Sequence, residues 1–178
     1  AAREEQIEGL RLLRTPSAQG TGLLGQMKLS AARIAEVVRD EKPDLLHVHS
    51  PVLNALPALW VRLSQRLPVV YEMRASWEDA AVDHGTTNEG SLRYRLSRAL
   101  ESFALRHADQ VTTICEGLRA DITTRGIASE RITVIPNAVD VGSFQFGVPA
   151  DPGLQQRLGL TGCTVIGFAG SFYGYEGL

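Results

Sequence analysis

The sequence contains only two cysteines, Cys115 and Cys163, and neither has a metal-ligand or redox spacing. We therefore expect no disulfide framework, and we expect both to be reduced, half-buried thiols of a cytoplasmic protein. No apolar run approaches the roughly 20 residues that cross a bilayer. The formal net charge of −2 gives no electrostatic reason to expect nucleic acid as a partner.

What is present is typical of a globular protein, with 44% hydrophobic and 21% charged residues. Short β-branched runs alternate with amphipathic segments. Strands are predicted at 10–14, 45–49, 67–71, 110–114 and 131–135, and helices at 27–39, 52–65, 91–107 and 116–124. This alternation predicts an α/β fold, a Rossmann-like parallel sheet with helices on both faces.

The pattern changes after Ile135, where prolines and glycines become frequent. We expect a first domain at residues 1–145, a linker at 146–162 and the start of a second Rossmann-like domain at 163–178. A buried strand is predicted at 164–169 of that second domain. Because the chain begins without Met and ends just after this strand, we expect it to be a piece of a longer polypeptide.

Polar residues follow the predicted strand 67–71, at the edge where open α/β sheets bind ligands. Glu72 and Arg74 point the same way along a strand, so Glu72 can hold Arg74 in place. The alternative is a purely structural ion pair. Trp77 and Asp79 fall in a long predicted loop, 73–90, as part of a sugar-binding platform or as solvated charges.

Two histidines, His47 and His49, share one face of the predicted strand 45–49. Because no third ligand is near them in the sequence, we expect no metal site. His47 is interpreted as a core histidine. His49, beside Ser50, is interpreted either as an acceptor contact or as a structural residue.

The predicted helix 91–107 begins at an N-cap, Ser91. Its apolar stripe comprises Leu92, Leu96, Ala99, Leu100 and Phe103. We expect this stripe to face the core. The alternative is a basic amphipathic helix that lies on an anionic membrane, since arginines flank the stripe.

Three segments together resemble family-4 glycosyltransferases of the GT-B architecture: PDLLHVHSP (43–51), VIPNAVDVGSF (134–144) and VIGFAGSFYGYEGL (165–178). The segment VVYEMRASWEDAAVDHGTT (69–87) is similar to members found near exosortase and exopolysaccharide loci. On this resemblance, residues 1–145 form the acceptor-side domain without its first strand and Gly-rich loop. Nearly all of the donor-binding domain is then missing, and we expect these 178 residues alone to be inactive.

The resemblance implies retaining transfer of a hexose from a nucleotide sugar to a polysaccharide or lipid-linked acceptor, without a metal or other cofactor. It also implies a cytoplasmic enzyme with peripheral contact at the inner membrane face. Arg74 stands where many members place a histidine that faces the donor sugar. Because a guanidinium stays protonated, Arg74 can orient hydroxyls or stabilise a departing phosphate but cannot act as a base.

The resemblance also suggests roles for residues beyond the first sheet. Asn137 holds a turn or contacts the cleft, and the backbone N–H groups of Gly170 and Ser171 are candidate donors to the diphosphate. Ser171 and Glu176 replace the arginine and lysine of the family's phosphate loop. Two alternatives stay open: a nucleotide-sugar 2-epimerase of the same architecture, and a non-catalytic sugar-binding module.

Overall fold

The chain divides into two compact units, residues 1–136 and residues 137–178. The computed structural model describes residues 4–15, 20–144 and 147–170. The first unit contains the sheet and its helices, and the second contains one short helix, α6 (Pro152–Arg157), among its described residues.

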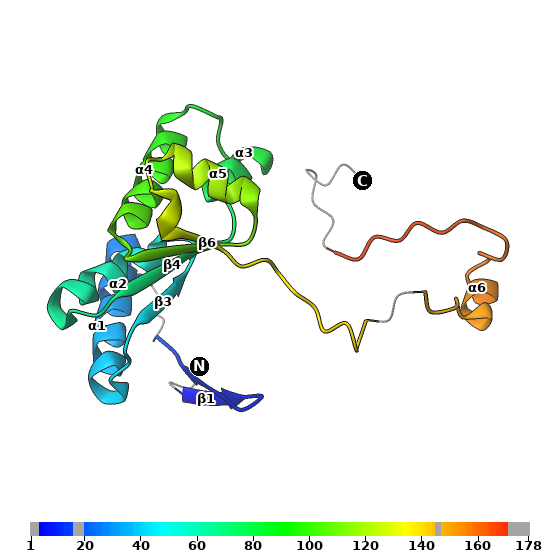
Figure 1. Ribbon diagram of the computed structural model, residues 1–178, viewed down its shortest axis with the longest axis horizontal. Helices are drawn as coiled ribbons and strands as arrows, with labels where there is room; N and C mark the ends of the chain where they lie inside the picture. Colours follow the sequence, from blue (N-terminus) through cyan, green and yellow to red (C-terminus); the bar gives the residue numbers. More distant parts are fainter. Residues whose placement is uncertain (1–3, 16–19, 145–146, 171–178) are drawn as a thin grey trace. The chain divides into compact units, whose positions relative to one another are not determined.

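Four parallel strands form the main sheet, and they lie in chain order (Figure 1). They are β3 (Leu46–His49), β4 (Val69–Met73), β5 (Gln110–Thr113) and β6 (Ile132–Val134). All four overlap strands predicted from the sequence. The prediction of a Rossmann-like parallel sheet flanked by helices is therefore confirmed. Helices on both faces were also predicted, whereas the three helices that connect these strands lie on one face.

The helices that connect these strands pack against one face of the sheet, because successive right-handed crossovers in the same direction fall on the same side. They are α2 (Val52–Gln65), α4 (Leu92–His107) and α5 (Glu116–Thr124). Val69, Tyr71 and Met73 line that face, and each is 0% exposed. The alternate residues of β4, Val70 and Glu72, point to the other face and are only partly buried.

Helix α1 (Leu23–Glu41) is longer than predicted and packs on α2 through a small second core, formed by Ala31, Val38 and Val61. Before it, β1 (Glu4–Ile7) and β2 (Leu10–Leu13) form a separate antiparallel hairpin. Glu8 and Gly9 both have positive φ, as a two-residue hairpin turn requires. The strand predicted at 10–14 therefore exists, but it belongs to this hairpin and not to the main sheet.

Helix α4 buries a different face from the one predicted. Its cap is as expected, since the N–H of Tyr94 donates to the Ser91 hydroxyl at 3.2 Å. The predicted core stripe, however, lies in solvent, with Leu92 74% and Leu96 56% exposed. The buried residues are instead Glu101, Ser102, Ala104 and Leu105. Leucine spacing alone therefore did not identify the side of α4 that faces the sheet.

The predicted loop 73–90 contains a helix, α3 (Trp77–Asp83). Ser76 has an extended conformation before it, and Glu78 and Asp79 occupy its first turn. Acidic side chains are favourable there because the N-terminal end of a helix carries a partial positive charge. Ser76, Glu78 and Asp79 were therefore a sequence signal for the start of a helix. The helix has only seven residues, which is too short for its apolar periodicity to be recognised.

The second unit lacks the strand predicted at 164–169. Among residues 147–170, the regular structure is α6, whose N-cap Asp151 accepts hydrogen bonds from the N–H groups of Gly153 and Leu154. Ile166, predicted to be buried, is 96% exposed. A parallel strand needs a hydrogen-bonded neighbour, and the described part of this unit offers none.

Both cysteines are free, as predicted. They are exposed, however, so the prediction that they are half-buried is wrong. Cys115 directly precedes α5, at a loop position outside the hydrophobic core.

Candidate functional site

The carboxyl ends of β3 and β4 are tied together by the backbone and side chain of Ser50. Its N–H donates to the carbonyl of Glu72 at 2.8 Å, and its hydroxyl accepts from the N–H of Arg74 at 3.2 Å. The turn after β3 is thus fixed to the residues that leave β4. Ser50, a predicted substrate contact, also has this structural role.

Glu72 is the centre of a charged cluster at this edge. Its Oε1 lies 3.2 Å from Nη1 of Arg74, so the predicted contact between these two side chains is present. The Glu72 side chain is 15% exposed and that of Arg74 is 48% exposed. The guanidinium is therefore held by a sheltered carboxylate while it remains open to solvent.

The other carboxylate oxygen of Glu72 faces two histidines. Oε2 lies 3.1 Å from Nε2 of His47 and 3.3 Å from Nδ1 of His49. The imidazole rings stack with their centroids 4.8 Å apart. His47 is exposed, so its interpretation as a core histidine is wrong. Glu72 is the third candidate ligand that sequence proximity did not show, because it comes from the neighbouring strand.

The residues predicted to form a sugar platform lie on α3, and the helix directs their side chains to different sides. Trp77 is 49% exposed, whereas Glu78 is 2% exposed and points into the protein. Asp79 accepts a hydrogen bond from the Tyr94 hydroxyl at 2.7 Å. Burial alone would raise the pKa of Asp79, but hydrogen bonding, including that from Tyr94, and the nearby Arg98 guanidinium lower it overall.

A cleft of about 460 Å³ opens between the N-terminal end of α2 and helices α3 and α4. Its lining is mostly apolar and includes Pro51, Val52, Trp77, Ala81, Tyr94 and Leu100. Two aromatic side chains thus border a hollow that begins directly after Ser50. Of the predicted platform residues, Trp77 retains an exposed face beside this cleft.

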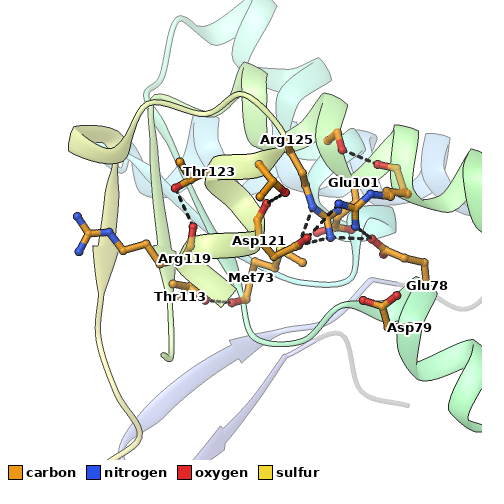
Figure 2. Close-up of polar contacts among 12 residues, drawn as sticks. Met73, Glu78, Asp79, Glu101, Thr113, Arg119, Asp121, Thr123 and Arg125 are labelled. Carbon is orange, nitrogen blue, oxygen red and sulfur yellow. Dashed lines mark hydrogen bonds and ion pairs between the residues drawn. The ribbon is translucent and has the colours of Figure 1, made fainter. Parts of the chain in front are cut away.

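Next to the cleft, a network of buried and partly buried ion pairs fastens α3 to α4 and α5 (Figure 2). Nη2 of Arg125 lies 2.7 Å from Oε1 of Glu78 and also contacts Asp121. Arg98 of α4 approaches Glu78 at 3.4 Å and Asp121 at 3.0 Å. Two cations therefore balance two carboxylates, which is the condition under which charges are tolerated in a protein interior.

A second buried contact joins β4 to α4. The Tyr71 hydroxyl donates to Oε1 of Glu101 at 2.5 Å. Burial raises the pKa of Glu101 by more than the hydrogen bond from Tyr71 lowers it. Burial and the neighbouring carboxylate likewise raise the pKa of Tyr71, so the phenol stays protonated and remains the donor.

Sequence reasoning missed this network. A signal was available: Arg98, Glu101 and Ser102 interrupt the helix 91–107 at spacings of three and four, which places charged residues along one helical face. A charged helical face of this kind is normally predicted to be solvent-exposed when the opposite face carries leucines. The partners Glu78 and Asp121 come from other segments, and pattern alone does not reveal them.

The remaining predicted site residues lie beyond the first unit. Asn137 is the first residue of the second unit and is exposed. Gly170 is also exposed, and a side chain there would lie 2.9 Å from the Phe168 ring. Ser171 and Glu176 lie outside the described residues.

The first unit is thus an α/β domain of the Rossmann-like class, with charged residues gathered at the carboxyl ends of its parallel strands. A family model described as "Glycosyl transferase 4-like domain" matches residues 1–138. This match covers more than half of the chain, and the chain belongs to that family. The family assignment implies a sugar donor and an acceptor as the general substrates.

No curated protein matches the sequence significantly. Among the helices that the structure describes, none combines the length and the apolar character that a membrane span requires.

Proposed function

We propose that this chain is the acceptor-side part of a retaining glycosyltransferase of the GT-B architecture, which transfers a hexose from a nucleotide sugar to a polysaccharide or lipid-linked acceptor. The proposal includes a donor-binding domain that follows the first unit and completes the site. Without that domain, residues 1–178 do not turn over. The similarity of residues 69–87 to exopolysaccharide-associated members supports the choice of acceptor.

The observation that carries the proposal is the Glu72–Arg74 pair. A permanently charged guanidinium, 48% exposed, is held at the carboxyl end of β4 by a carboxylate 3.2 Å away. A cation at that edge can orient the hydroxyls of the donor sugar and stabilise the charge that develops on the departing diphosphate. Arg74 is the proposed catalytic residue. Glu72 orients it and contacts no reacting atom.

Retaining transfer of this kind does not require a strong protein base, because the departing phosphate can accept the proton of the acceptor hydroxyl. Positioning and electrostatic stabilisation then supply the rate. Transfer is accordingly proposed to need no metal ion or cofactor. This agrees with an arginine, which cannot remove a proton at working pH.

The acceptor is proposed to enter the cleft beside Trp77. An aromatic face packs against the C–H groups of a sugar ring, while His49 and Ser50 supply hydrogen-bonding groups at the mouth. Asp79 already accepts a hydrogen bond from Tyr94. Its second oxygen is proposed to accept from an acceptor hydroxyl, so Asp79 would contribute both to folding and to binding.

The donor is proposed to be held by residues of the second unit. Asn137 and the backbone N–H groups of Gly170 and Ser171 are the groups that the family resemblance suggests for this role. Glu176, which replaces a cation of the family's loop, is proposed not to bind phosphate. Cations farther along the donor-binding domain would take over that role.

The exposed apolar stripe of α4 supports peripheral association with the cytoplasmic face of the inner membrane. Leu92, Leu96 and Leu100 lie in solvent along one side of the helix. Arg95 and Arg106 are exposed on the same helix and carry positive charge. An anionic lipid surface complements both features, and such a surface would present a lipid-linked acceptor.

The test is the exchange of Arg74 in the polypeptide that contains both domains. We expect Arg74→Ala to lower kcat by about 100–1,000-fold, the loss typical of one electrostatic contact to a transition state. Arg74→Lys should recover part of the rate, since it restores the charge without the planar fork. Arg39→Ala, on an exposed residue of α1, is the matched control and should leave kcat unchanged.

The assay also separates the alternatives. Incubation with nucleotide sugars in the absence of an acceptor should leave the donors unchanged. Interconversion of the sugars would establish an epimerase instead. Unchanged transfer by Arg74→Ala would remove Arg74 from the mechanism, and sugar binding without turnover would favour a non-catalytic module.

A further inference from the structure

Three metal-ligating side chains converge on the open face of the sheet. His47 and His49 come from β3, Glu72 comes from β4, and their ligand atoms all lie within 4.8 Å of one another. The strand register produces this arrangement, since His49 pairs with Glu72 and His47 pairs with Val70. Side chains two residues apart share a face, so His49 lies directly across from Glu72 and His47 lies diagonally across from it.

The spacing is close to that of a coordination shell. Metal–ligand bonds of about 2.0–2.1 Å in a tetrahedron place neighbouring ligand atoms roughly 3.3 Å apart. Oε2 of Glu72 is already 3.1 Å from Nε2 of His47 and 3.3 Å from Nδ1 of His49. The histidine side chains are 43% and 54% exposed, so their rings have room to turn toward a common ion.

The ligand types select the class of metal. Two imidazoles with one carboxylate suit borderline dications such as Zn²⁺, Co²⁺ and Ni²⁺, whereas Mg²⁺ and Ca²⁺ prefer oxygen ligands throughout. Three protein ligands also leave one position of a tetrahedron for water or another small ligand. A groove of about 370 Å³ beside the two histidines provides space for it.

The surroundings orient the carboxylate for this role. Nη1 of Arg74 contacts Oε1 of Glu72 at 3.2 Å and leaves Oε2 directed at the histidines. The N–H of Ser50 fixes the Glu72 backbone through its carbonyl at 2.8 Å. Partners of this kind hold metal ligands in place, although the charge of Arg74 also opposes the binding of a second cation.

We propose that His47, His49 and Glu72 form a binding site for a divalent transition metal of the zinc class. The metal site shares Glu72 and His49 with the proposed transfer site, but the transfer step itself is proposed to need no metal. The ion and Arg74 would share one carboxylate from opposite sides. Binding of the ion can be measured without turnover, so this proposal is tested independently of the role assigned to Arg74.

The test uses the metal-free 178-residue chain and measures its binding to Zn²⁺ and Co²⁺. Because Cys115 and Cys163 are exposed, both are changed to serine in the reference protein, so that thiolates do not contribute. Calorimetry should give one Zn²⁺ per chain. Co²⁺ should show the visible absorption of a four- or five-coordinate ion, and added Zn²⁺ should abolish that absorption.

The ligand variants are His47→Ala, His49→Ala and Glu72→Gln. Each should weaken Zn²⁺ binding by at least about 10–100-fold, the loss that even an outer-sphere partner causes. His84→Ala is the matched control, since His84 lies on a different segment outside the cluster, and should not change the affinity. Arg74→Ala should tighten binding, because it removes a positive charge from the shared carboxylate.

A circular-dichroism spectrum and a melting curve for each variant establish that the fold is retained. Equal Zn²⁺ affinity in the reference protein and in a His47→Ala/His49→Ala double variant would overturn the proposal. The absence of Zn²⁺ binding to the folded reference protein would overturn it equally. Neither result depends on nucleotide sugars or on enzymatic turnover.

Discussion

Nη2 of Arg125 lies 2.7 Å from Oε1 of Glu78, and the two side chains are 2% and 1% exposed. This contact joins the end of α5 to the first turn of α3. Helix α3 also carries Trp77, which borders the candidate acceptor cleft, and Asp79, the proposed contact to the acceptor. A buried ion pair therefore determines where the proposed sugar-binding surface lies.

Glu78→Gln should destabilise the first unit, because it leaves the buried charge of Arg125 with Asp121 as its remaining carboxylate. Removal of one partner from a buried pair typically costs about 3–5 kcal/mol, and we expect about 3 kcal/mol here. The free energy of unfolding in urea measures the effect. Glu89→Gln, on an exposed residue before α4, is the control; a similar loss in both variants would contradict a special role for Glu78.

Glu101→Gln tests the buried contact with Tyr71. Burial raises the pKa of Glu101 above its usual 4.5, so the folded state binds this proton more tightly than the unfolded chain. Its contribution to stability is present below pH 4.5 and is lost as the pH rises through the folded-state pKa. Gln keeps an acceptor for the Tyr71 hydroxyl but carries no charge. The variant should therefore become more stable relative to the wild type as the pH rises above 4.5.

Urea titrations of both proteins at several pH values give this difference directly. Other carboxylates cancel in the comparison, including Asp79, whose lowered pKa stabilises the folded state at high pH and loses that effect on acidification. A difference in unfolding free energy that stays constant across the range would show that Glu101 does not titrate differently in the folded state.

Local signals predicted much of the fold. The bounds of α2 and α5 agree with those predicted, and the Ser91 cap of α4 is present. Helix periodicity, caps and short strands depend on residues a few positions apart, and a sequence displays these directly. The parallel order of the strands followed from the alternation of helices with strands.

Features that depend on distant segments were not predicted. The leucines of α4 suggested one buried face, yet the sheet packs against Ala104 and Leu105, and Glu101 reaches Tyr71. Glu72 joins the histidines only because β3 and β4 pair in a particular register. Periodicity shows that a helix has two unlike faces. It does not show which face packs against the rest of the protein. Partners from other segments, such as Glu78 and Asp121 for Arg98, can make the charged face the inner one.

Tyr94→Phe should loosen the attachment of α3 to α4 without unfolding the domain. The variant loses the 2.7 Å hydrogen bond to Asp79, which is a charged acceptor at a partly exposed position. We expect a cost of about 1 kcal/mol. Hydrogen exchange should accelerate at the backbone amides of α3 and should stay unchanged in β4 and β5. Uniform acceleration throughout the first unit would indicate global destabilisation instead.

The exposed stripe of α4 predicts binding to membranes. Leu96 and Leu100 are 56% and 44% exposed, so their replacement by serine should change the free energy of unfolding very little. Insertion of the two half-exposed leucines into a lipid interface should contribute about 2 kcal/mol. We therefore expect the Leu96→Ser/Leu100→Ser double variant to bind anionic vesicles roughly 30-fold more weakly in sedimentation assays.

Leu10→Ser is the matched control. Leu10 is 68% exposed on the separate hairpin, and its replacement by serine removes a similar apolar area. Its binding to vesicles should equal that of the wild type. Zwitterionic vesicles should bind all three proteins weakly, since they do not attract Arg95 and Arg106. Equal sedimentation of the double variant and the wild type on anionic vesicles would show that α4 is not the membrane-binding surface. The apolar stripe would then require a protein partner, because water alone does not favour a row of exposed leucines.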